Sequence, residues 1–439
     1  MNALTDPRDL LDRTPMSALQ IIAIAITIGL NGLDGFDVMS ISFASPGIAA
    51  EWGIDRAALG VVLSMELIGM ALGSVLLGGV ADNIGRRKTI LGCLVVMAIG
   101  MFMATTASSP VNLSTWRVLT GLGIGGMLAA INAGAAEFSN GERRNLSVSL
   151  MAIGYPIGSV LGGLVAKELL TGSDWRSVFY FGAAITAIFI PVVYLLVPES
   201  VHWLARKQPP QALARINATL ARFGKQAVAA LPQTSAAESK VSLTEIFAPG
   251  MMRITLVMTV TYFLHITTFY YIIKWVPKIV VDMGFNAASA AGVLVWANVG
   301  GATGGAILGF MTQRFGLKGL TLAVMVASTV VVTLFGQTPA DLNRLSLICF
   351  FCGLFVNAGI VGLYAMLAQV FPTQMRASGT GFAIGCGRGG SVLAPIVAGF
   401  LFEGGLSLGA VSLIMSLGSL TAAAALVLLK YQEPVVAKA

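Results

Sequence analysis

Apolar runs of about 20 residues recur along this chain from end to end, and they constrain its fold more than any other feature. A helix of that length spans about 30 Å, which is the thickness of the hydrocarbon core of a bilayer. Only 11% of the residues are charged, against about 25% in soluble proteins. A soluble core cannot bury so much apolar surface. The sequence therefore predicts membrane-spanning helices, in which each backbone polar group finds its partner within its own helix.

The apolar runs predict about twelve membrane-spanning helices, and therefore an all-α membrane protein. The predicted spans are 17–42, 57–81, 89–107, 112–137, 146–168, 176–197, 252–280, 287–311, 318–337, 342–369, 374–402 and 406–430. A polar segment divides them into two bundles of six. The predicted domains are an N-terminal tail at 1–16, a bundle at 17–197, a linker at 198–250, a second bundle at 251–430 and a C-terminal tail at 431–439.

The second bundle repeats part of the first. Residues 78–85 align with residues 309–316, and residues 137–147 align with residues 369–379. In membrane proteins built from two such repeats, the substrate path lies between the repeats, near the middle of the membrane. The sequence therefore predicts two pseudo-symmetric bundles that rock about a shared central site.

Lysine and arginine are unevenly shared between the loops on the two sides of the predicted spans. Cytoplasmic loops of membrane proteins carry an excess of both residues. If the termini are cytoplasmic, the opposite side holds only Arg56, Lys167, Arg176, Lys274, Lys278 and Arg344. We therefore expect both tails and the linker to face the cytoplasm. Residues 1–15 lack the charged, apolar and cleavage regions of a signal peptide, so we expect no removable leader.

A glycine-rich loop carries charge between the second and third predicted spans. Its sequence at 78–88 is Gly-Gly-Val-Ala-Asp-Asn-Ile-Gly-Arg-Arg-Lys. It resembles the signature loop of the major facilitator superfamily, which has glycines, an acid and then Gly-Arg-x-Lys/Arg. The resemblance implies a latch that holds one end of a transporter closed, formed by Gly78, Asp82, Gly85, Arg86, Arg87 and Lys88. The alternative is that the three basic residues only set the topology.

An arginine lies within the fourth predicted span, where it begins the pattern Arg-x-x-x-Gly-x-Gly-x-Gly-Gly at Arg117. This pattern resembles the membrane-buried arginine motif of the same superfamily. A guanidinium in hydrocarbon costs several kcal/mol unless it is paired or hydrated, so it indicates a function. The alternative is that Arg117 extends to the membrane surface, since Pro110 is only a few residues away. No strand precedes the glycines, which excludes a dinucleotide-binding fingerprint.

Acidic residues also lie within the apolar runs. Asp34 and Asp37 are three residues apart in the first span and share a helix face. Two neighbouring carboxylates in a low dielectric cannot both ionise cheaply, so such a pair is suited to take up and release a proton. The alternative is that they cap a helix break near Gly32 and Gly35. Glu66 in the second span either takes part in transport or makes a hydrogen bond between helices.

A second arginine lies among glycines in the eleventh predicted span, in the sequence Gly-Cys-Gly-Arg-Gly-Gly-Ser at 385–391. Arg388 presents a planar fork of donors that matches the geometry of a carboxylate. We therefore expect it to bind the carboxylate of a substrate. The alternative is an internal pair with Asp34 or Asp37.

Several elements together resemble the aromatic acid:proton symporter branch of the superfamily. They are the Asp-Gly-Phe-Asp sequence at 34–37, the signature loop, the buried arginine, Glu-Phe at 137–138 and Gly-Tyr-Pro-Ile-Gly at 154–158. The resemblance implies a carrier in a bacterial inner membrane that imports benzoate-like or hydroxylated aromatic carboxylates with protons. It implies that Asp34, Asp37, Arg117 and Glu137 take part in coupling. It also implies that Arg388 lies near the substrate carboxylate.

The rest of the predicted substrate site is aromatic or polar. Besides Arg388 and Asp37, the rings that would stack on a substrate are Phe36, Tyr155, Phe269, Tyr270, Trp296 and Phe382. Their alternative role is packing within the membrane. His265 aligns with Asp34 in the repeat and would relay a proton or bind a substrate hydroxyl. The alternative is a hydrogen bond between helices.

No pattern in the sequence indicates catalysis. We therefore expect that the protein is not an enzyme and that it has no cofactor, no metal site and no nucleic-acid partner. We expect it to be a monomer in the lipid bilayer. The pair Cys349-x-x-Cys352 has no second ligand pair, so we interpret it as packing. Two rival functions stay open. The first is a drug:proton antiporter, because Pro156 lies where such antiporters carry a glycine-proline motif. The second is a membrane sensor, although a sensor would need a signalling domain, and the loops are too short to form one.

Overall fold

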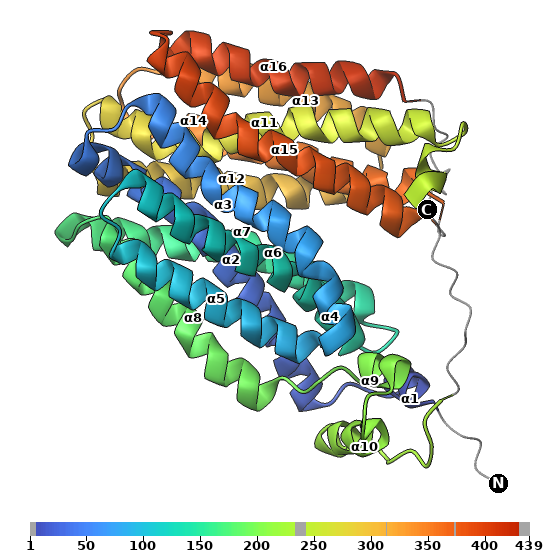
Figure 1. The fold of residues 1–439 in the computed structure, drawn as a ribbon. Helices are drawn as coiled ribbons and strands as arrows, with labels where there is room; N and C mark the ends of the chain where they lie inside the picture. Colours follow the sequence, from blue (N-terminus) through green and yellow to red (C-terminus); the bar gives the residue numbers. More distant parts are fainter. Residues whose placement is uncertain (1–5, 233–242, 313, 373–374, 430–439) are drawn as a thin grey trace. The chain divides into compact units, whose positions relative to one another are not determined.

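A computed structural model of the chain describes residues 6–232, 243–312, 314–372 and 375–429 (Figure 1). Within these ranges all regular secondary structure is helical. Twelve of the described helices are long and apolar enough to cross a membrane, which confirms the predicted fold class at this level. The predicted C-terminal tail at 431–439, residues 1–5 of the N-terminal tail and part of the predicted linker at 233–242 lie outside the described residues.

The helices of the N-terminal half follow the predicted spans, with four short helices added. Their bounds are α1 Pro7–Arg13, α2 Ala18–Trp52, α3 Arg56–Leu76, α4 Gly78–Ile84, α5 Arg86–Thr105, α6 Pro110–Glu137, α7 Arg144–Gly172, α8 Arg176–Leu196, α9 Val201–Lys207 and α10 Ala212–Arg222. Local capping fixes several of their starts. At α6, for example, Ser109 accepts a hydrogen bond from the Asn112 amide and Pro110 occupies the first helical position.

The C-terminal half begins with a 3-10 helix and continues with six long helices. Their bounds are η1 Leu243–Phe247, α11 Met252–Asp282, α12 Ala287–Met311, α13 Leu317–Phe335, α14 Leu342–Val370, α15 Arg376–Glu403 and α16 Leu408–Val427. Asn286, Asp341 and Ser407 cap three of these helices through their side chains. These polar caps mark the point at which each helix and its apolar run begin, as a membrane-spanning segment requires.

The chain forms two compact units. The first comprises Met1–Val38, Ile68–Ser159 and Phe179–Glu238, and the second comprises Met39–Leu67, Val160–Val178 and Ser239–Ala439. In the first unit α5 packs on α6, and in the second α11 packs on α12, α14, α15 and α16. The division of the chain into two six-helix bundles, with the boundaries given above, stays a prediction.

Glycines let α2 and α7 touch through their backbones in the first unit. A Cβ atom added to Gly158 would lie 1.8 Å from the carbonyl oxygen of Gly32, and one added to Gly154 would lie 2.3 Å from that of Ile28. Asn31 donates a hydrogen bond to the Met151 carbonyl oxygen, at 2.7 Å, beside this contact. Such close approach between membrane helices depends on small residues, because side chains would hold the backbones apart.

We expect Gly158→Ala to lower the thermal stability of the purified protein. The added methyl group meets backbone rather than a flexible side chain, so the helices must separate, at a cost of about 1–3 kcal/mol. The matched control is Gly92→Ala in α5, where an added Cβ meets nothing within 4 Å. Thermal unfolding in detergent, followed by tryptophan fluorescence, measures both variants. Equal midpoints for the two would contradict the backbone contact.

Candidate functional site

The two aspartates of the first predicted span are buried in the first unit. Asp34 is 2% exposed and Asp37 is fully buried. The α2 helix runs unbroken through both residues, so the alternative that they cap a helix break is wrong. Phe36 lies between them in the sequence, and its ring packs edge-on against Phe181 at 5.3 Å. A Cβ added to Gly182 would lie 3.4 Å from the Oδ1 atom of Asp37.

Arg117 joins this cluster from α6. Its side chain is fully buried, so the alternative that it extends to the membrane surface is wrong. Its Nη2 atom donates a 3.0 Å hydrogen bond to the main-chain oxygen of Asp37, and Nη1 contacts the sulfur of Met101 at 2.9 Å. The guanidinium also lies over the ring of Phe179, at 5.1 Å. Asp34, Asp37 and Arg117 thus form a cluster of ionisable residues in the interior of the first unit, and their part in proton coupling stays a prediction.

Tyr155 lies on the α7 side of the same region. A Cβ added to Gly35 would lie 2.1 Å from the Tyr155 main-chain oxygen. The hydroxyl of Ser159 donates to the main-chain oxygens of Gly35 and Tyr155, each at 3.0 Å. The turn of α2 that carries the aspartates is therefore held against α7 by a close main-chain approach at Gly35 and by the Ser159 hydroxyl.

Arg86 is the centre of an ion-pair network in the signature loop. It is the first residue of α5 and its side chain is 7% exposed. Its guanidinium donates to both carboxylate oxygens of Glu137, at 3.0 and 3.2 Å. It also donates to Asp82 and to the main-chain oxygen of Ala81, each at 2.8 Å. Glu137, predicted to couple protons, therefore lies in the latch network, and its coupling role stays a prediction.

The polar segment after α8 adds further bonds to this loop. Arg206 pairs with Asp82 at 2.7 Å, and the indole of Trp203 donates to the Asp82 main-chain oxygen at 2.9 Å. Lys207 donates to the Asn83 side chain at 3.2 Å. Sequence reasoning did not foresee these contacts, because they join residues more than 100 positions apart.

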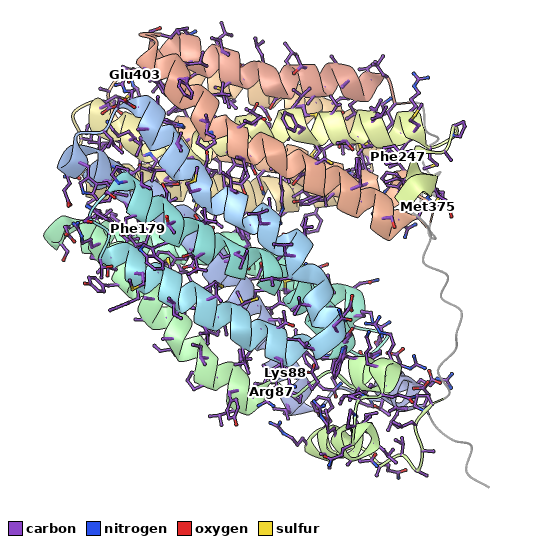
Figure 2. The ribbon with its side chains drawn as sticks, viewed as in Figure 1. Arg87, Lys88, Phe179, Phe247, Met375 and Glu403 are labelled. Atoms are coloured by element: carbon purple, nitrogen blue, oxygen red, sulfur yellow. The ribbon has the colours of Figure 1, made fainter. Side chains whose placement is uncertain are left out.

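The other predicted latch residues differ in their surroundings. Gly78 begins α4. Figure 2 shows Arg87 and Lys88 at the N-terminal end of α5. Arg87 donates to the main-chain oxygen of Tyr194, and its guanidinium lies over the Tyr194 ring at 4.9 Å, which ties α5 to α8. Lys88 is exposed. The gating role of all six residues stays a prediction.

Glu199 caps the N-terminus of α5, a role that sequence reasoning missed. Its Oε1 atom accepts hydrogen bonds from the amides of Arg86, Arg87 and Ser200, at 2.8, 3.3 and 3.1 Å. Gly85, with a φ of 107°, leaves the space that this carboxylate fills, because an added Cβ would lie 2.3 Å from Oε2. Burial raises the pKa of Glu199 above its ordinary value, even though the three amide hydrogen bonds oppose the shift.

We expect Glu199→Gln to gain stability over the wild type as the pH rises. At low pH both folded and unfolded wild-type chains carry a protonated Glu199. Because its pKa is higher in the folded state, the unfolded state ionises first as the pH increases, and the wild type loses stability. The Gln side chain keeps an oxygen for the three amides and does not ionise. Unfolding midpoints at about pH 5 and about pH 8 measure the difference, which should be larger at the higher pH.

The control for this pH effect is Glu142→Gln, at an exposed position. We expect its midpoint to follow that of the wild type at both pH values. A constant difference between Glu199→Gln and the wild type across the pH range would contradict the raised pKa.

Arg388 lies in α15 of the second unit and is partly buried. Its main-chain oxygen accepts a 2.6 Å hydrogen bond from the Ser391 hydroxyl. Next to it in α15, Gly387 packs on the ring of Tyr262, because an added Cβ would lie 1.9 Å from the Cδ1 atom of that ring. The Tyr270 ring meets Phe269 edge-on at 5.2 Å. These positions agree with the predicted substrate residues without testing their role.

His265 is fully buried and ties three helices together. Its Nε2 atom lies 2.9 Å from the Val356 main-chain oxygen in α14, and Nδ1 lies 2.9 Å from the Ser419 hydroxyl in α16. A carbonyl oxygen only accepts, so Nε2 carries the proton in the neutral ring and Nδ1 accepts from Ser419. Both nitrogens are thus engaged in contacts between helices, and the geometry favours the alternative interpretation over substrate binding.

Two other predicted aromatic residues pack against neighbouring rings. Trp296 is 51% exposed, and its ring lies 6.5 Å from that of Phe350. Phe382 meets Phe247 edge-on at 5.0 Å. An exposed ring on a membrane-spanning helix can contact lipid or another segment of the protein. The proposed stacking role of both residues therefore stays a prediction.

Lys274 lies inside a helix, which corrects the expectation that it belongs to a loop. It belongs to α11, its side chain is fully buried, and its Nζ atom lies 3.8 Å from the Oε2 atom of Glu66 in α3. Glu66 is also fully buried. Counting charges along the sequence missed this pair, because neither residue is near the other in the chain.

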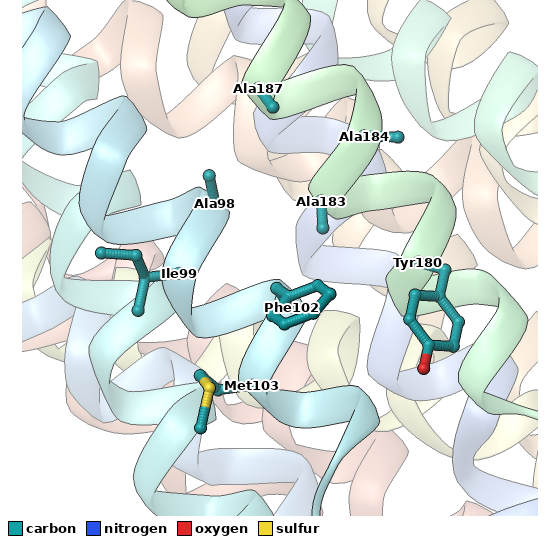
Figure 3. Close-up of a pocket in the computed structure, with 8 residues that line it drawn as sticks. All are labelled: Ala98, Ile99, Phe102, Met103, Tyr180, Ala183, Ala184 and Ala187. Atoms are coloured by element: carbon teal, nitrogen blue, oxygen red, sulfur yellow. The ribbon is translucent and has the colours of Figure 1, made fainter.

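An apolar groove of about 560 Å³ lies between α5 and α8 in the first unit. Figure 3 shows its lining side chains, with Phe102 and Tyr180 facing each other across the two helices. It is lined by Ala98, Ile99, Phe102, Met103, Tyr180, Ala183, Ala184 and Ala187. None of the described residues that line it is charged, so it does not suit an organic anion, whereas lipid chains suit such a surface.

The fold and the signature residues agree with the comparisons to known proteins. The sequence profile of the Major Facilitator Superfamily matches residues 27–341, and this chain belongs to that superfamily. It is a multi-pass membrane transport protein, not an enzyme. The gallate transporter of Pseudomonas putida is 27% identical over 430 residues, covering 97% of this chain and 95% of that protein.

A second relative and a solved structure extend the comparison. The 4-hydroxybenzoate transporter PcaK of Pseudomonas putida is 26% identical over 393 residues, covering 88% of this chain and 87% of that protein. The inward-open structure of the xylose transporter XylE from E. coli superposes with a TM-score of 0.73 at 18% identity, covering 95% and 97% of the two chains. These findings confirm the major facilitator fold and the predicted resemblance to the aromatic acid:proton symporter branch.

Proposed function

We propose that this chain is a proton-coupled secondary transporter that imports a small aromatic carboxylate, such as benzoate or a hydroxybenzoate, by alternating access. The buried cluster of Asp34, Asp37 and Arg117 is the observation that carries the proposal. Ionisable groups inside a membrane protein are costly and mark ion or substrate pathways. The relatives named for gallate and 4-hydroxybenzoate support the substrate class, since both compounds are aromatic carboxylates.

The aspartates supply the proton site in this proposal. Arg117 donates to the main-chain oxygen of Asp37, so its fixed positive charge lies beside the turn of α2 that carries the aspartates. A proton taken up by Asp34 or Asp37 would lower the negative charge of the cluster by one. The cluster would thus differ in charge between its protonated and deprotonated states, which is what coupling to a proton gradient requires.

The substrate site falls to the second unit. Arg388 is the cation for the carboxylate, and Tyr270 offers a ring and a hydroxyl in the same unit. Phe269 and Trp296 of this unit remain candidates to contact the substrate ring, and the ring-binding roles of Phe36 and Tyr155 in the first unit stay predictions. Alternating access would link protonation of the aspartates to binding at this site.

The network around Arg86 supplies the latch. Its bonds to Glu137 and Asp82 would hold one end of the transporter closed, and their loss would permit opening. We propose that this end faces the cytoplasm with both termini, in a bacterial inner membrane, and that the transporter works as a monomer. The excess of Lys and Arg in the loops on that side supports the orientation.

Uptake into proteoliposomes tests the proposal. We expect radiolabelled 4-hydroxybenzoate to accumulate when the interior is made alkaline, and a protonophore to abolish the accumulation. A competition panel of benzoates, phenylpropanoids and aliphatic acids would define the substrate. Inhibition by aliphatic acids alone would make the protein another organic-anion symporter, and efflux of cationic drugs against proton entry would make it a drug:proton antiporter. Either result would overturn the aromatic substrate class.

A further inference from the structure

Two tyrosines of the second unit form a hydrogen-bonded pair. The hydroxyl of Tyr262 in α11 lies 3.0 Å from the hydroxyl of Tyr364 in α14, and the two ring centroids are 5.8 Å apart. Tyr262 is 2% exposed, whereas Tyr364 is 44% exposed. The pair therefore joins a buried phenol to a phenol that keeps a large exposed surface.

The burial of Tyr262 fixes the direction of this hydrogen bond. In the described part of the chain, the bond between them is the one hydrogen bond that either hydroxyl makes. A buried donor without an acceptor is costly, so the O–H of Tyr262 points to Tyr364. The Tyr364 oxygen accepts this bond, and its own hydrogen is left to donate to another acceptor. A hydroxyl that accepts one hydrogen bond is polarised and becomes a stronger donor in the next.

The pair lies beside the turn of α15 that carries Arg388. The ring of Tyr262 packs directly on the backbone of Gly387, which lies near the middle of α15. Substrate sites of transporters built from two repeats lie near the middle of the membrane. A Cβ added to Gly385, three residues before Arg388, would meet no described atom within 4 Å. The face of α15 that Gly385 shares with Arg388 is therefore open at this point.

The exposed phenol of Tyr364 needs a polar neighbour. Both α11 and α14 are long and apolar enough to span a membrane. The core of a bilayer holds no water, so an O–H group that faced the hydrocarbon would have no acceptor there. The exposed side of Tyr364 is thus suited to a polar cavity, and the group that it recognises is an oxygen acceptor.

We propose that Tyr364 donates a hydrogen bond to a ring hydroxyl of the substrate, and that Tyr262 orients Tyr364 for this contact; this rests on the proposed function. Arg388 takes the carboxylate of the acid, and Tyr364 takes the hydroxyl on another carbon of the ring. The transporter therefore selects hydroxylated aromatic acids over benzoate, which has no ring oxygen to accept the bond. Tyr262 is a positioning residue, because it acts through Tyr364.

Equilibrium binding of benzoate, 3-hydroxybenzoate and 4-hydroxybenzoate to the purified protein tests the proposal. The readout is the Kd of benzoate divided by the Kd of the hydroxybenzoate that binds more tightly. We expect a ratio of roughly five in the wild type, the size of effect that one neutral hydrogen bond has. Tyr364→Phe keeps the ring and loses the oxygen, so we expect its ratio to fall to about one, with its Kd for benzoate within about twofold of the wild type. We expect an intermediate ratio in Tyr262→Phe, where Tyr364 keeps its hydroxyl but loses the bond that orients it.

The matched control is Tyr271→Phe in the same helix. Tyr271 is fully buried, and its hydroxyl lies 2.7 Å from that of Ser412 in α16. This variant also loses a bond between two hydroxyl groups, so we expect a lower unfolding midpoint but the wild-type ratio. A general loss of packing weakens the binding of all three acids alike and leaves the ratio unchanged. Thermal unfolding of each variant shows that folded protein is being compared.

An unchanged ratio in Tyr364→Phe would overturn the role of Tyr364, and an unchanged ratio in Tyr262→Phe would overturn that of Tyr262. An equal loss of affinity for all three acids in Tyr364→Phe would place its hydroxyl on the carboxylate instead. A wild type that binds benzoate as tightly as the hydroxybenzoates would also overturn the selection. In each of these cases the wild type still binds aromatic acids, as the proposed function requires. A wild type that binds none of the three acids would overturn the proposed function and this assignment with it.

Discussion

Asp37→Asn will lose accumulation of aromatic acids against a gradient, while the protein still inserts and folds. Asn has nearly the same shape as Asp but takes up no proton, and the bond from Arg117 goes to the main-chain oxygen of residue 37, which the variant keeps. We expect the rate of gradient-driven uptake to fall about 100-fold, the size of effect that a positioned proton-transfer group has. Uptake of radiolabelled 4-hydroxybenzoate into proteoliposomes with an alkaline interior measures the rate.

The control for this prediction is Asp174→Asn, at a side chain that is 60% exposed between α7 and α8. Its uptake should match that of the wild type. Thermal unfolding of both variants separates loss of coupling from loss of folding. Full accumulation by Asp37→Asn would remove this residue from the coupling mechanism and leave Asp34 as the remaining aspartate to test.

Arg86→Gln will lower both stability and transport. The variant leaves Glu137 without this cation, while Asp82 keeps its pair with Arg206, and breaking a largely buried pair in this way costs about 3 kcal/mol. A change of about 5.5 kcal/mol is enough to move a two-state equilibrium from 1:99 to 99:1. We therefore expect Arg86→Gln to populate the latch-closed state less than the wild type does. We also expect it to transport at least roughly tenfold more slowly. Uptake rates and unfolding midpoints measure the two effects.

A double-mutant cycle checks that the effect comes from the pair. Glu137→Gln and Arg86→Gln/Glu137→Gln should each lose about as much as Arg86→Gln alone, because the contacts are shared. Arg143→Gln, at an exposed position on the neighbouring loop, should behave as the wild type. Additive losses in the cycle would show that Arg86 and Glu137 act independently.

The membrane-spanning helices could be predicted because their signal is local. The predicted spans 252–280 and 287–311 agree closely with α11 at Met252–Asp282 and α12 at Ala287–Met311. The end of α2 was less predictable. The apolar run ends at 42, but the helix continues through Pro46 to Trp52. Neighbouring helices can satisfy the backbone group that a proline leaves without a partner in a membrane helix.

The candidate site was predictable in its residue types but not in its pairings. Buried charges are unusual in apolar runs, so Asp34, Asp37 and Arg117 were recognisable from the sequence. The partner of a charge depends on tertiary distance, which the sequence does not state. For this reason Lys274 was counted with the loops, and Glu199 was not recognised as the cap of α5.

The cap formed by Glu199 also changes the character of the segment that connects the two halves of the sequence. Through Glu199, Trp203 and Arg206 this segment is bonded to the signature loop, and Arg222 donates to the main-chain oxygen of Leu195. Figure 1 shows α9 beside α1 and α10, and α9 packs against both of these helices. Residues 199–222 therefore act as a brace that moves with the first unit. A tag or protease site inserted within these residues would disrupt folded structure, whereas an unstructured linker would tolerate such an insertion.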